Sequence, residues 1–255
     1  MNRLITIAPS HYCEKARWAL RLAGVEYKEE PHLPFFHAYY VKKAGGQRST
    51  PALWTPDDTL SDSSDILQWI QGLADSRWKP YGEEPERAVE IDLWERWMSQ
   101  RLGDSTRRVA YFYLMPNAPL TQKSLGSGVP SVEQRWLPRL FSAMRWVMRR
   151  SMRIDHKNTE RSIAKIHEIF DGVEELLKNN AEKGYLFGEF SAADLSFATL
   201  AAPVLLPSGY LSQIPKIEEL PEAGQTVIRD FQERKAGQFA LRIYEELEQR
   251  NSSVR

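Results

Sequence analysis

The pattern of strands and helices that the sequence predicts changes near residue 75, and this change constrains the fold most. Before it, strand-like alternation and helical spacing follow one another in the order strand, helix, strand, helix, strand, strand, helix. After it, strand patterns largely cease and apolar residues recur at helical spacing. The chain therefore predicts an α+β protein with a mixed domain over residues 1–75 and an all-helical domain over residues 86–255.

The predicted N-terminal elements are short and are separated by turn-forming residues. Leu4, Ile5 and Ile7 fit a strand that Pro9 ends, and the following helix ends at Gly24. The other predicted elements are a strand at 25–29, a helix at 35–44, strands at 51–54 and near 59–60, and a helix capped by Ser61 or Asp62 that carries Ile66, Leu67 and Ile70.

The rest of the chain begins with a predicted linker at residues 76–85, where proline and glycine are frequent. A second segment rich in these residues, 117–130, is predicted to be a loop. Helices are predicted near 85–102, 132–153, 157–179, 191–205, 221–234 and 237–250.

Charge and cysteine content exclude several classes of protein. Basic and acidic residues both number 34, so the net charge is zero and a dedicated nucleic-acid binder is not expected. The N-terminus lacks a signal-peptide pattern and no run of eighteen apolar residues occurs, which favours a cytoplasmic protein without membrane association. Cys13 is the only cysteine, which excludes an internal disulfide and a cysteine-built metal site.

Ser10 lies between the first predicted strand and the first predicted helix. Unpaired amides and the positive dipole end at a helix N-terminus favour a nearby thiolate. Lowering a thiol pKa by two units needs roughly 2.7 kcal/mol of preferential stabilisation, which a hydroxyl donor and the helix terminus together can supply. The plainer interpretation is that Ser10 only caps the helix.

Two further short motifs fit an amino-acid or peptide ligand. Pro51 begins the third strand, and a cis bond there would expose the backbone of Thr50 to a peptide-like ligand. Asp62 and Ser63 begin a predicted helix, where a hydroxyl and an amide could bind a carboxylate and Asp62 could bind an ammonium. Taken alone, each motif also fits an ordinary strand edge or a capped helix.

In combination, three motifs resemble the thioredoxin-fold domain of the glutathione S-transferase superfamily: Ser10-x-x-Cys13-x-x-x-Arg17, Thr50-Pro51-x-Leu53, and Leu60-x-Asp62-Ser63-x-x-Ile66. A segment from Gly188 to Asp194 resembles the family's Gly-x-x-Phe/Tyr-Ser/Thr-x-Ala-Asp element, in which Ser191 and Asp194 form a capping box. The resemblance covers residues 3–75 and 155–205. It implies a thioredoxin-like βαβαββα domain, glutathione as co-substrate without a metal, and a homodimer through the third and fourth helices.

The resemblance also implies roles for single residues. Ser10 occupies the position that is Ser in tau- and zeta-like classes and Cys in omega-like ones, which implies activation of the glutathione thiol. Thr50 and Pro51 would hold the glutathione backbone, Asp62 and Ser63 its γ-glutamyl group, and His37 its glycine carboxylate. His11 replaces the family's proline and is interpreted as a solvated ring. Trp97 and Tyr113 are the candidates for the co-substrate pocket.

Cys13 leaves an alternative open. It lies where glutaredoxins carry the second cysteine of Cys-x-x-Cys, so it is a second catalytic candidate or a buried small apolar residue. The first functional hypothesis is a glutathione transferase that attacks, reduces or dehalogenates an electrophilic small molecule. The alternatives are a non-catalytic binding or structural protein and a thiol-disulfide reductase that depends on Cys13.

An arginine-rich segment lies outside these motifs. Residues 134–154 contain six arginines and no acid, with Trp136, Leu140, Trp146 and Val147 between them. The segment fits a membrane-surface or anion-binding helix. It also fits a solvated face whose arginines pair with acids elsewhere, which the zero net charge favours.

Overall fold

The N-terminal part of the chain forms a four-stranded mixed sheet. The computed structural model describes residues 1–180 and 182–252. Strands β1 (Asn2–Thr6), β2 (Tyr27–Pro31), β3 (Ala52–Trp54) and β4 (Thr59–Leu60) lie in the order β2-β1-β3-β4. β1 is parallel to β2 and antiparallel to β3, and β4 is antiparallel to β3. This is the predicted thioredoxin-like sheet.

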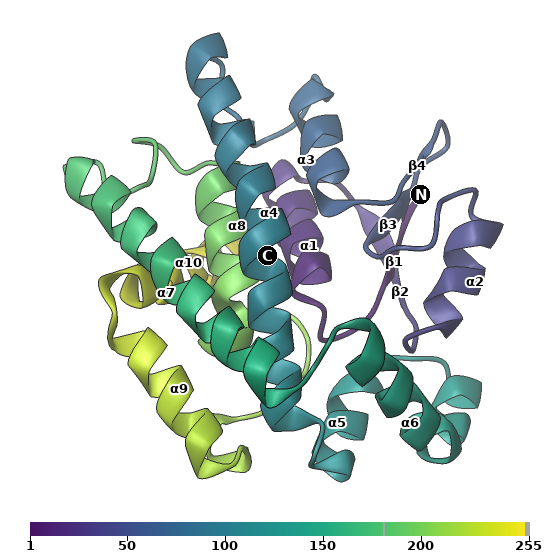
Figure 1. The fold of residues 1–255 in the computed structure, drawn as a ribbon. Helices are drawn as coiled ribbons and strands as arrows, with labels where there is room; N and C mark the ends of the chain where they lie inside the picture. The colour runs from purple at the N-terminus through teal and green to yellow at the C-terminus, as the bar shows by residue number, and fades with distance from the viewer. Residues whose placement is uncertain (181, 253–255) are drawn as a thin grey trace.

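Three helices cover the two faces of this sheet. α1 (His11–Ala23) and α3 (Ser63–Gly72) pack against each other on one face, and α2 (Phe36–Lys43) lies on the other (Figure 1). The alternation of side chains in a strand explains this arrangement. Leu4 and Leu53 pair across the sheet and join the core of α1 and α3, whereas Ile5 and Ala52 contact Val41 of α2.

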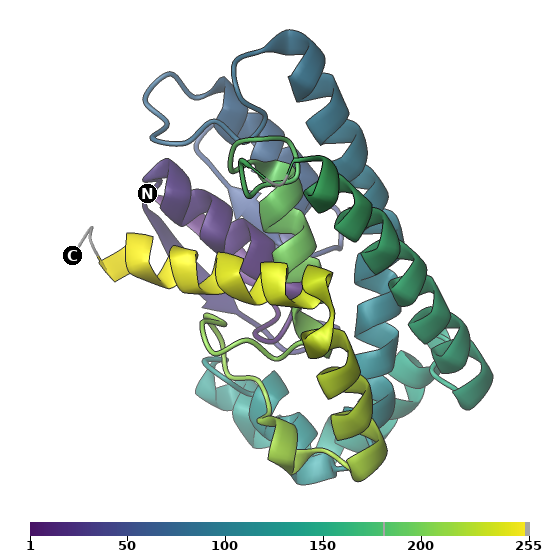
Figure 2. The same ribbon diagram turned by 90° about the vertical axis from the view of Figure 1, so that its left-hand side faces the viewer.

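The rest of the described chain is helical. Its helices are α4 (Pro85–Leu114), α5 (Ala118–Leu125), α6 (Ser131–Ser151), α7 (His156–Asn179), α8 (Ala192–Ala201), α9 (Glu222–Glu233) and α10 (Lys235–Ser252), with short 3₁₀ turns η1 (Ala202–Val204) and η2 (Ile217–Glu219). α8 is wholly buried among α1, α4 and α10, and α10 covers it in Figure 2. The helical part therefore surrounds one central helix.

The capping box predicted at the start of α8 is confirmed. The Asp194 carboxylate accepts hydrogen bonds from the backbone N–H groups of Leu186 and Ser191 and from the Ser191 hydroxyl. Burial raises the pKa of Asp194 to about 6. The motif thus fixes the turn that precedes the central helix.

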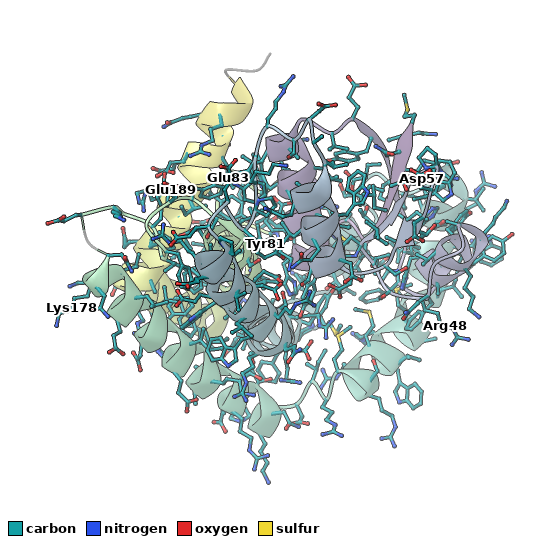
Figure 3. The ribbon with its side chains drawn as sticks, turned by 90° about the horizontal axis from the view of Figure 1, so that it is seen from above. Arg48, Asp57, Tyr81, Glu83, Lys178 and Glu189 are labelled. Atoms are coloured by element: carbon teal, nitrogen blue, oxygen red, sulfur yellow. The ribbon has the colours of Figure 1, made fainter. Side chains whose placement is uncertain are left out.

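The segment between α3 and α4 packs against both parts of the molecule. The Pro80 carbonyl accepts a hydrogen bond from Ala192 N, and the Trp78 indole donates to the Phe190 carbonyl. Tyr81 is buried and its backbone N–H donates to the Gln71 side chain. In Figure 3, Tyr81 lies between the N-terminal part that carries Arg48 and Asp57 and the helical part that carries Lys178 and Glu189.

Two predictions for the helical part were wrong. The helix expected to end near residue 102 continues to Leu114, because Gly103, Thr106 and Val109 pack into the core and the Thr106 hydroxyl donates to Leu200 O. Tertiary contacts there outweigh weak helix propensity. The loop expected at 117–130 contains α5, which Asn117 caps by accepting from Leu120 N, with the following proline in the tolerated first turn.

Candidate functional site

Two adjoining cavities of different chemical character lie between the N-terminal part and the helical part. The polar cavity, of about 440 Å³, is lined at the starts of β3 and α3 and by the middle of α4. The apolar cavity, of about 300 Å³, extends from the start of α1 between α4, α6 and α9. Both are lined by Tyr12, Ser49, Thr50 and Arg107, so the cavities meet at these four residues.

Ser10 lines the apolar cavity at the N-terminus of α1. Its extended backbone makes it the N-cap residue, and its Oγ accepts a hydrogen bond from Cys13 N at 3.4 Å. The cap uses the Ser10 hydroxyl as an acceptor, and a serine hydroxyl also carries one O–H donor. The capping interpretation is therefore confirmed at this residue, and donation to a thiolate stays a prediction.

Thr50 and Pro51 stand where the polar cavity begins. The Thr50–Pro51 peptide bond is cis. Both residues line the polar cavity, and Thr50 also lines the apolar one. The sequence prediction of a cis bond is confirmed.

The start of α3 supplies two polar side chains to the polar cavity. Asp62 is the N-cap, and its carboxylate accepts from Ser64 N at 2.7 Å while the side chain remains exposed. Ser63 is buried, and its Oγ has no hydrogen-bond partner in the described chain. A buried hydroxyl without a partner is costly, and a ligand oxygen in the cavity would satisfy it.

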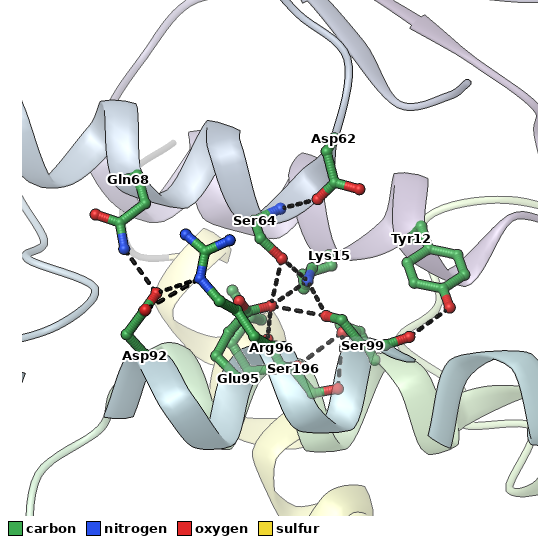
Figure 4. A network of polar contacts seen from close by, with 12 residues as sticks. Tyr12, Lys15, Asp62, Ser64, Gln68, Asp92, Glu95, Arg96, Ser99 and Ser196 are labelled. Atoms are coloured by element: carbon green, nitrogen blue, oxygen red, sulfur yellow. Dashed lines mark hydrogen bonds and ion pairs between the residues drawn. The ribbon is translucent and has the colours of Figure 1, made fainter. Parts of the chain in front are cut away.

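Beneath this helix start lies a buried polar network (Figure 4). Lys15 of α1 contacts Glu95 of α4, and the Ser64 and Ser99 hydroxyls donate to the same Glu95 oxygen at 2.9 and 2.8 Å. Burial alone would raise the pKa of Glu95, but Lys15 and the serine hydroxyls hold it below its ordinary value. The network fixes the start of α3 to α1 and α4.

Cys13 lies away from both cavities. Its side chain is fully buried in α1 and lines neither space. Burial raises the pKa of its thiol, so the reactive thiolate is disfavoured. Its surroundings match the buried apolar interpretation of this residue.

The expectation that His11 is a solvated ring was wrong. The ring is buried against α4 and its Nε2–H donates to Gly103 O at 3.0 Å. Burial, aided by the charge of Arg107, lowers the pKa of His11 to about 3. The physical reason is the longer α4, which passes over the start of α1 and excludes water there.

His37 and Tyr113 line the apolar cavity, and Trp97 does not. Trp97 lies sixteen residues before Tyr113 on α4, which places it about 24 Å away along the helix axis. Its ring instead contacts Trp94 and is partly exposed. Trp97 therefore does not lie in the cavity that contains Tyr113.

Arg107 is a residue that sequence reasoning missed. It lines both cavities, one guanidinium nitrogen donates to Asp104, and its buried Nε has no partner in the described chain. A cation with a free donor at the junction favours an anionic ligand atom there. Apolar residues that continue at helical spacing beyond residue 102, such as Val109, were the signal that would have placed it on α4.

The described chain contains no cluster of three or more His, Cys, Asp or Glu side chains that would hold a metal ion. Among the helices described, none is both long and apolar enough to cross a membrane.

Comparison with known proteins supports the interpretation of the fold. Residues 4–78 match the family described as the glutathione S-transferase N-terminal domain. Among curated proteins, none matches the sequence. Many solved structures are similar, and all those given below are under 20% identical to this chain, so they indicate its fold alone.

Three solved structures illustrate the similarity. A glutathione transferase from Populus trichocarpa is 18% identical with a TM-score of 0.57, covering 96% of this chain and 100% of its own. The beta-etherase LigF from Sphingobium sp. strain SYK-6 is 18% identical with a TM-score of 0.58, covering 94% and 98%. A glutathione S-transferase of Ceriporiopsis subvermispora in complex with glutathione is 16% identical with a TM-score of 0.60, covering 97% of both chains. Residues 4–78 of this chain therefore match the glutathione S-transferase N-terminal domain, and the chain as a whole shares the fold of these glutathione transferase structures.

Proposed function

We propose that the chain is a glutathione transferase that binds glutathione in the polar cavity and activates its thiol at Ser10. The thiolate then attacks an electrophilic small molecule held in the apolar cavity. One observation carries the proposal: a polar and an apolar cavity meet at Thr50 and Arg107, and Ser10 lies on the wall of the apolar one. A charged tripeptide and an apolar electrophilic substrate need adjoining sites of this kind.

The polar cavity offers groups that match each part of glutathione. The exposed Asp62 carboxylate suits the α-ammonium, and the unpartnered Ser63 Oγ at the N-terminus of α3 suits the γ-glutamyl carboxylate. The backbone of Thr50 suits the cysteinyl amide. His37 lies on the adjoining cavity wall, where it would meet the glycine carboxylate.

With the γ-glutamyl group at Ser63 and the backbone at Thr50, the sulfur is directed toward Ser10 and α1. The Ser10 hydroxyl donates to the thiolate, and the dipole of α1 stabilises the same charge. Lowering the thiol pKa by two units requires about 2.7 kcal/mol from these groups. In a conjugation or a dehalogenation the thiolate forms a carbon–sulfur bond while halide or another leaving group departs with the bonding electron pair. In a reduction a second glutathione thiolate then attacks the sulfur of this adduct, so that glutathione disulfide leaves and the carbon takes up a proton.

An exposed apolar stripe on α4 supports the homodimer that the family resemblance implies. Val89, Leu93 and Trp97 stand four residues apart, so they share one face of the helix, and all three are exposed. Contiguous exposed apolar side chains favour a protein interface. We infer that this stripe contacts a second copy of the chain.

Of the two alternatives, the thiol-disulfide reductase is disfavoured by the burial of Cys13 and by the raised pKa of its thiol. The non-catalytic glutathione-binding protein shares the same cavities and differs only in turnover. An activity measurement separates it from the proposed transferase.

The test compares wild type, Ser10→Ala, Ser10→Thr and Cys13→Ala. Retention on immobilised glutathione reports binding, and conjugation of glutathione to a chlorodinitrobenzene reports turnover. We expect Ser10→Ala to bind glutathione but lose about a hundredfold in kcat, and its activity to require a higher pH. Ser10→Thr keeps a hydroxyl and should recover part of the activity, and Cys13→Ala should remain active.

Other outcomes would contradict the proposal. Retention by every variant without turnover by any, over a panel of halogenated aromatics, epoxides and disulfides, would identify a binding protein. Loss of activity in Cys13→Ala together with a neutral Ser10→Ala would show that Ser10 does not activate the thiol.

A further inference from the structure

The outward face of α6 carries large apolar side chains that nothing in the described chain covers. Trp146 is 67% exposed, Val132 63% and Trp136 48%, and Leu140 and Val147 are also exposed. At 100° per residue these five positions fall within an arc of about 120°. The α6 surface is defined here as this stripe together with the arginines around it.

The inward face of the same helix is already satisfied. Leu137, Phe141, Met144 and Met148 are buried in a core with α5 and the end of β2. Glu133 anchors the start of the helix by accepting from Leu33 N at 2.8 Å and contacting His32 at 2.6 Å. α6 is therefore held in place from within, and its outward apolar stripe does not serve the fold.

The arginines around the stripe lack acidic partners. Within the described residues, none of these side chains forms an ion pair: Arg135, Arg139, Arg145, Arg149, Arg150 and Arg153. Arg139 stacks over Trp136 and Arg145 over Phe141. Glu133, the one acid of the helix, is buried and already engaged. The sequence interpretation that these arginines pair with acids elsewhere was wrong.

We propose that the α6 surface binds the chain peripherally to an anionic phospholipid bilayer. Tryptophan side chains favour the interface between headgroups and acyl chains, where their rings are apolar and their N–H groups remain hydrated. Arginines beside them match the phosphates of anionic lipids in charge and in hydrogen-bond geometry. An anionic bilayer therefore matches an apolar stripe bordered by unpaired arginines more closely than a neutral protein surface does.

A second copy of the chain is a poorer occupant of the same surface. An isologous interface would bring the arginines of one copy against those of the other, and like charges there are unfavourable. The stripe at Val89, Leu93 and Trp97 on α4 offers a dimer contact without such a run of arginines. The two exposed surfaces therefore fit different partners.

Docking through α6 also has a consequence that rests on the proposed transferase function. Met148 and Ser151 of α6 line the apolar cavity. A chain docked in this way would hold that cavity close to the bilayer, where apolar electrophilic substrates concentrate. Lipid binding itself does not depend on that function and is tested without catalysis.

The experiment is flotation of the full chain with vesicles of phosphatidylcholine alone or mixed with phosphatidylglycerol. We expect binding to the mixed vesicles only, with a partition coefficient that falls as salt is raised. The paired substitutions Arg149→Gln with Arg150→Gln, and Trp136→Ala with Trp146→Ala, should each lower it at least about tenfold. Trp136→Phe with Trp146→Phe should retain most of the binding, because it keeps the apolar rings.

A matched control removes two exposed cations from another helix: Arg161→Gln with Lys165→Gln on α7 should leave the partition coefficient unchanged. Folding of every variant is checked by glutathione retention and urea unfolding. The proposal is overturned if the wild type does not float with anionic vesicles, or if the α6 pairs and the α7 pair behave alike. It is also overturned if the α6 pairs abolish dimer formation, or if the chain binds single-stranded RNA and not vesicles.

Discussion

Lys15 of α1 and Glu95 of α4 form a fully buried ion pair, with 2.5 Å between Nζ and Oε1. The pair joins the N-terminal part to the helical part directly beneath the start of α3. Because the Ser64 and Ser99 hydroxyls also donate to Glu95, the carboxylate is held in its charged state. The polar cavity thus rests on a charged network rather than on apolar packing.

Replacing Glu95 should therefore destabilise the fold strongly. Glu95→Gln leaves Lys15 buried without its partner, which costs about 3–5 kcal/mol of unfolding free energy. Lys15→Met combined with Glu95→Leu should cost less than the single change. Urea unfolding measures both, and a double variant less stable than Glu95→Gln would contradict this account. Because the folded pKa of Glu95 is lowered, its stabilisation is present above its ordinary pKa and is lost as pH falls through the folded value.

His11 should make stability fall in mildly acidic solution. Its pKa is lowered to about 3 by burial, from an ordinary value of 6.5. The buried neutral ring of His11 therefore stabilises the fold fully above pH 6.5. This contribution is lost as the pH falls toward the pKa of His11 in the folded protein, because the unfolded chain takes up the proton first. Between pH 7 and pH 5 this amounts to about 2 kcal/mol. In urea unfolding, the free energy of unfolding of His11→Gln should therefore fall by about 2 kcal/mol less than that of wild type between pH 7 and pH 5. An equal fall in both proteins would contradict this role of His11.

Gly103 allows the close approach of Tyr12 to α4. A Cβ at this position would lie 2.2 Å from the Tyr12 hydroxyl oxygen and 2.5 Å from the ring carbon that carries it. We expect Gly103→Ala to lower the unfolding free energy by about 1–3 kcal/mol and to reduce turnover, since Tyr12 lines both cavities.

Gly172 on α7 is the matched control for that substitution. A Cβ there would meet only the Trp94 ring at 3.9 Å, an ordinary contact. Gly172→Ala should therefore stabilise the fold by about 0.5–1 kcal/mol, as expected within a helix. If both alanine variants raised the unfolding free energy, the close contact between Gly103 and Tyr12 would not constrain this position.

Arg107 should contribute to binding of glutathione or of the thiolate. Arg107→Gln removes the charged donor at the junction of the cavities, and we expect the Kd for glutathione to rise at least about tenfold. Arg107→Lys should recover part of this loss. Titration calorimetry gives the affinities, and Arg101→Gln, an exposed arginine of the same helix that lines neither cavity, is the control. Equal affinities for Arg107→Gln and wild type would exclude this role.

Leu93 should be required for the proposed homodimer. Leu93→Glu places a charge in the exposed stripe of each copy, and we expect the dimer Kd to rise about a hundredfold. Val132→Glu on α6 is the matched control, since both side chains are 63% exposed in the single chain. Sedimentation measures the result. Dissociation by Val132→Glu and not by Leu93→Glu would assign the interface to α6.

The order of the N-terminal elements was predictable because local signals mark their boundaries. Pro9 ends β1, Gly24 adopts a left-handed backbone after α1, and Asp62 caps α3. The extent of α4 was not predictable in the same way. Gly103 and Thr106 have weak helix propensity, and only contacts with α8 and its neighbours keep them helical.

Residues that line the two cavities were predictable where a motif stands at an element boundary, as at Ser10, Thr50 and Ser63. Residues that reach the cavities from distant segments, such as Arg107 and Tyr210, carry no local motif. The burial of His11 was missed for a related reason, because its ring packs against Gly103 of α4, 92 residues further along the chain. Local sequence patterns predict where helices begin and end better than they predict which distant segments pack against those helices.

The division of the two cavities among different elements affects how such a protein can diversify. The polar cavity draws on the starts of β3 and α3 and on α4, whereas Leu220, Val227 and Ile228 from α9 and the segment before it line only the apolar one. Under the proposed function, selection for a new electrophile can act on α9 while the residues of the polar cavity stay unchanged. A library randomised at these three positions would then vary the electrophile that is accepted without altering the proposed glutathione site.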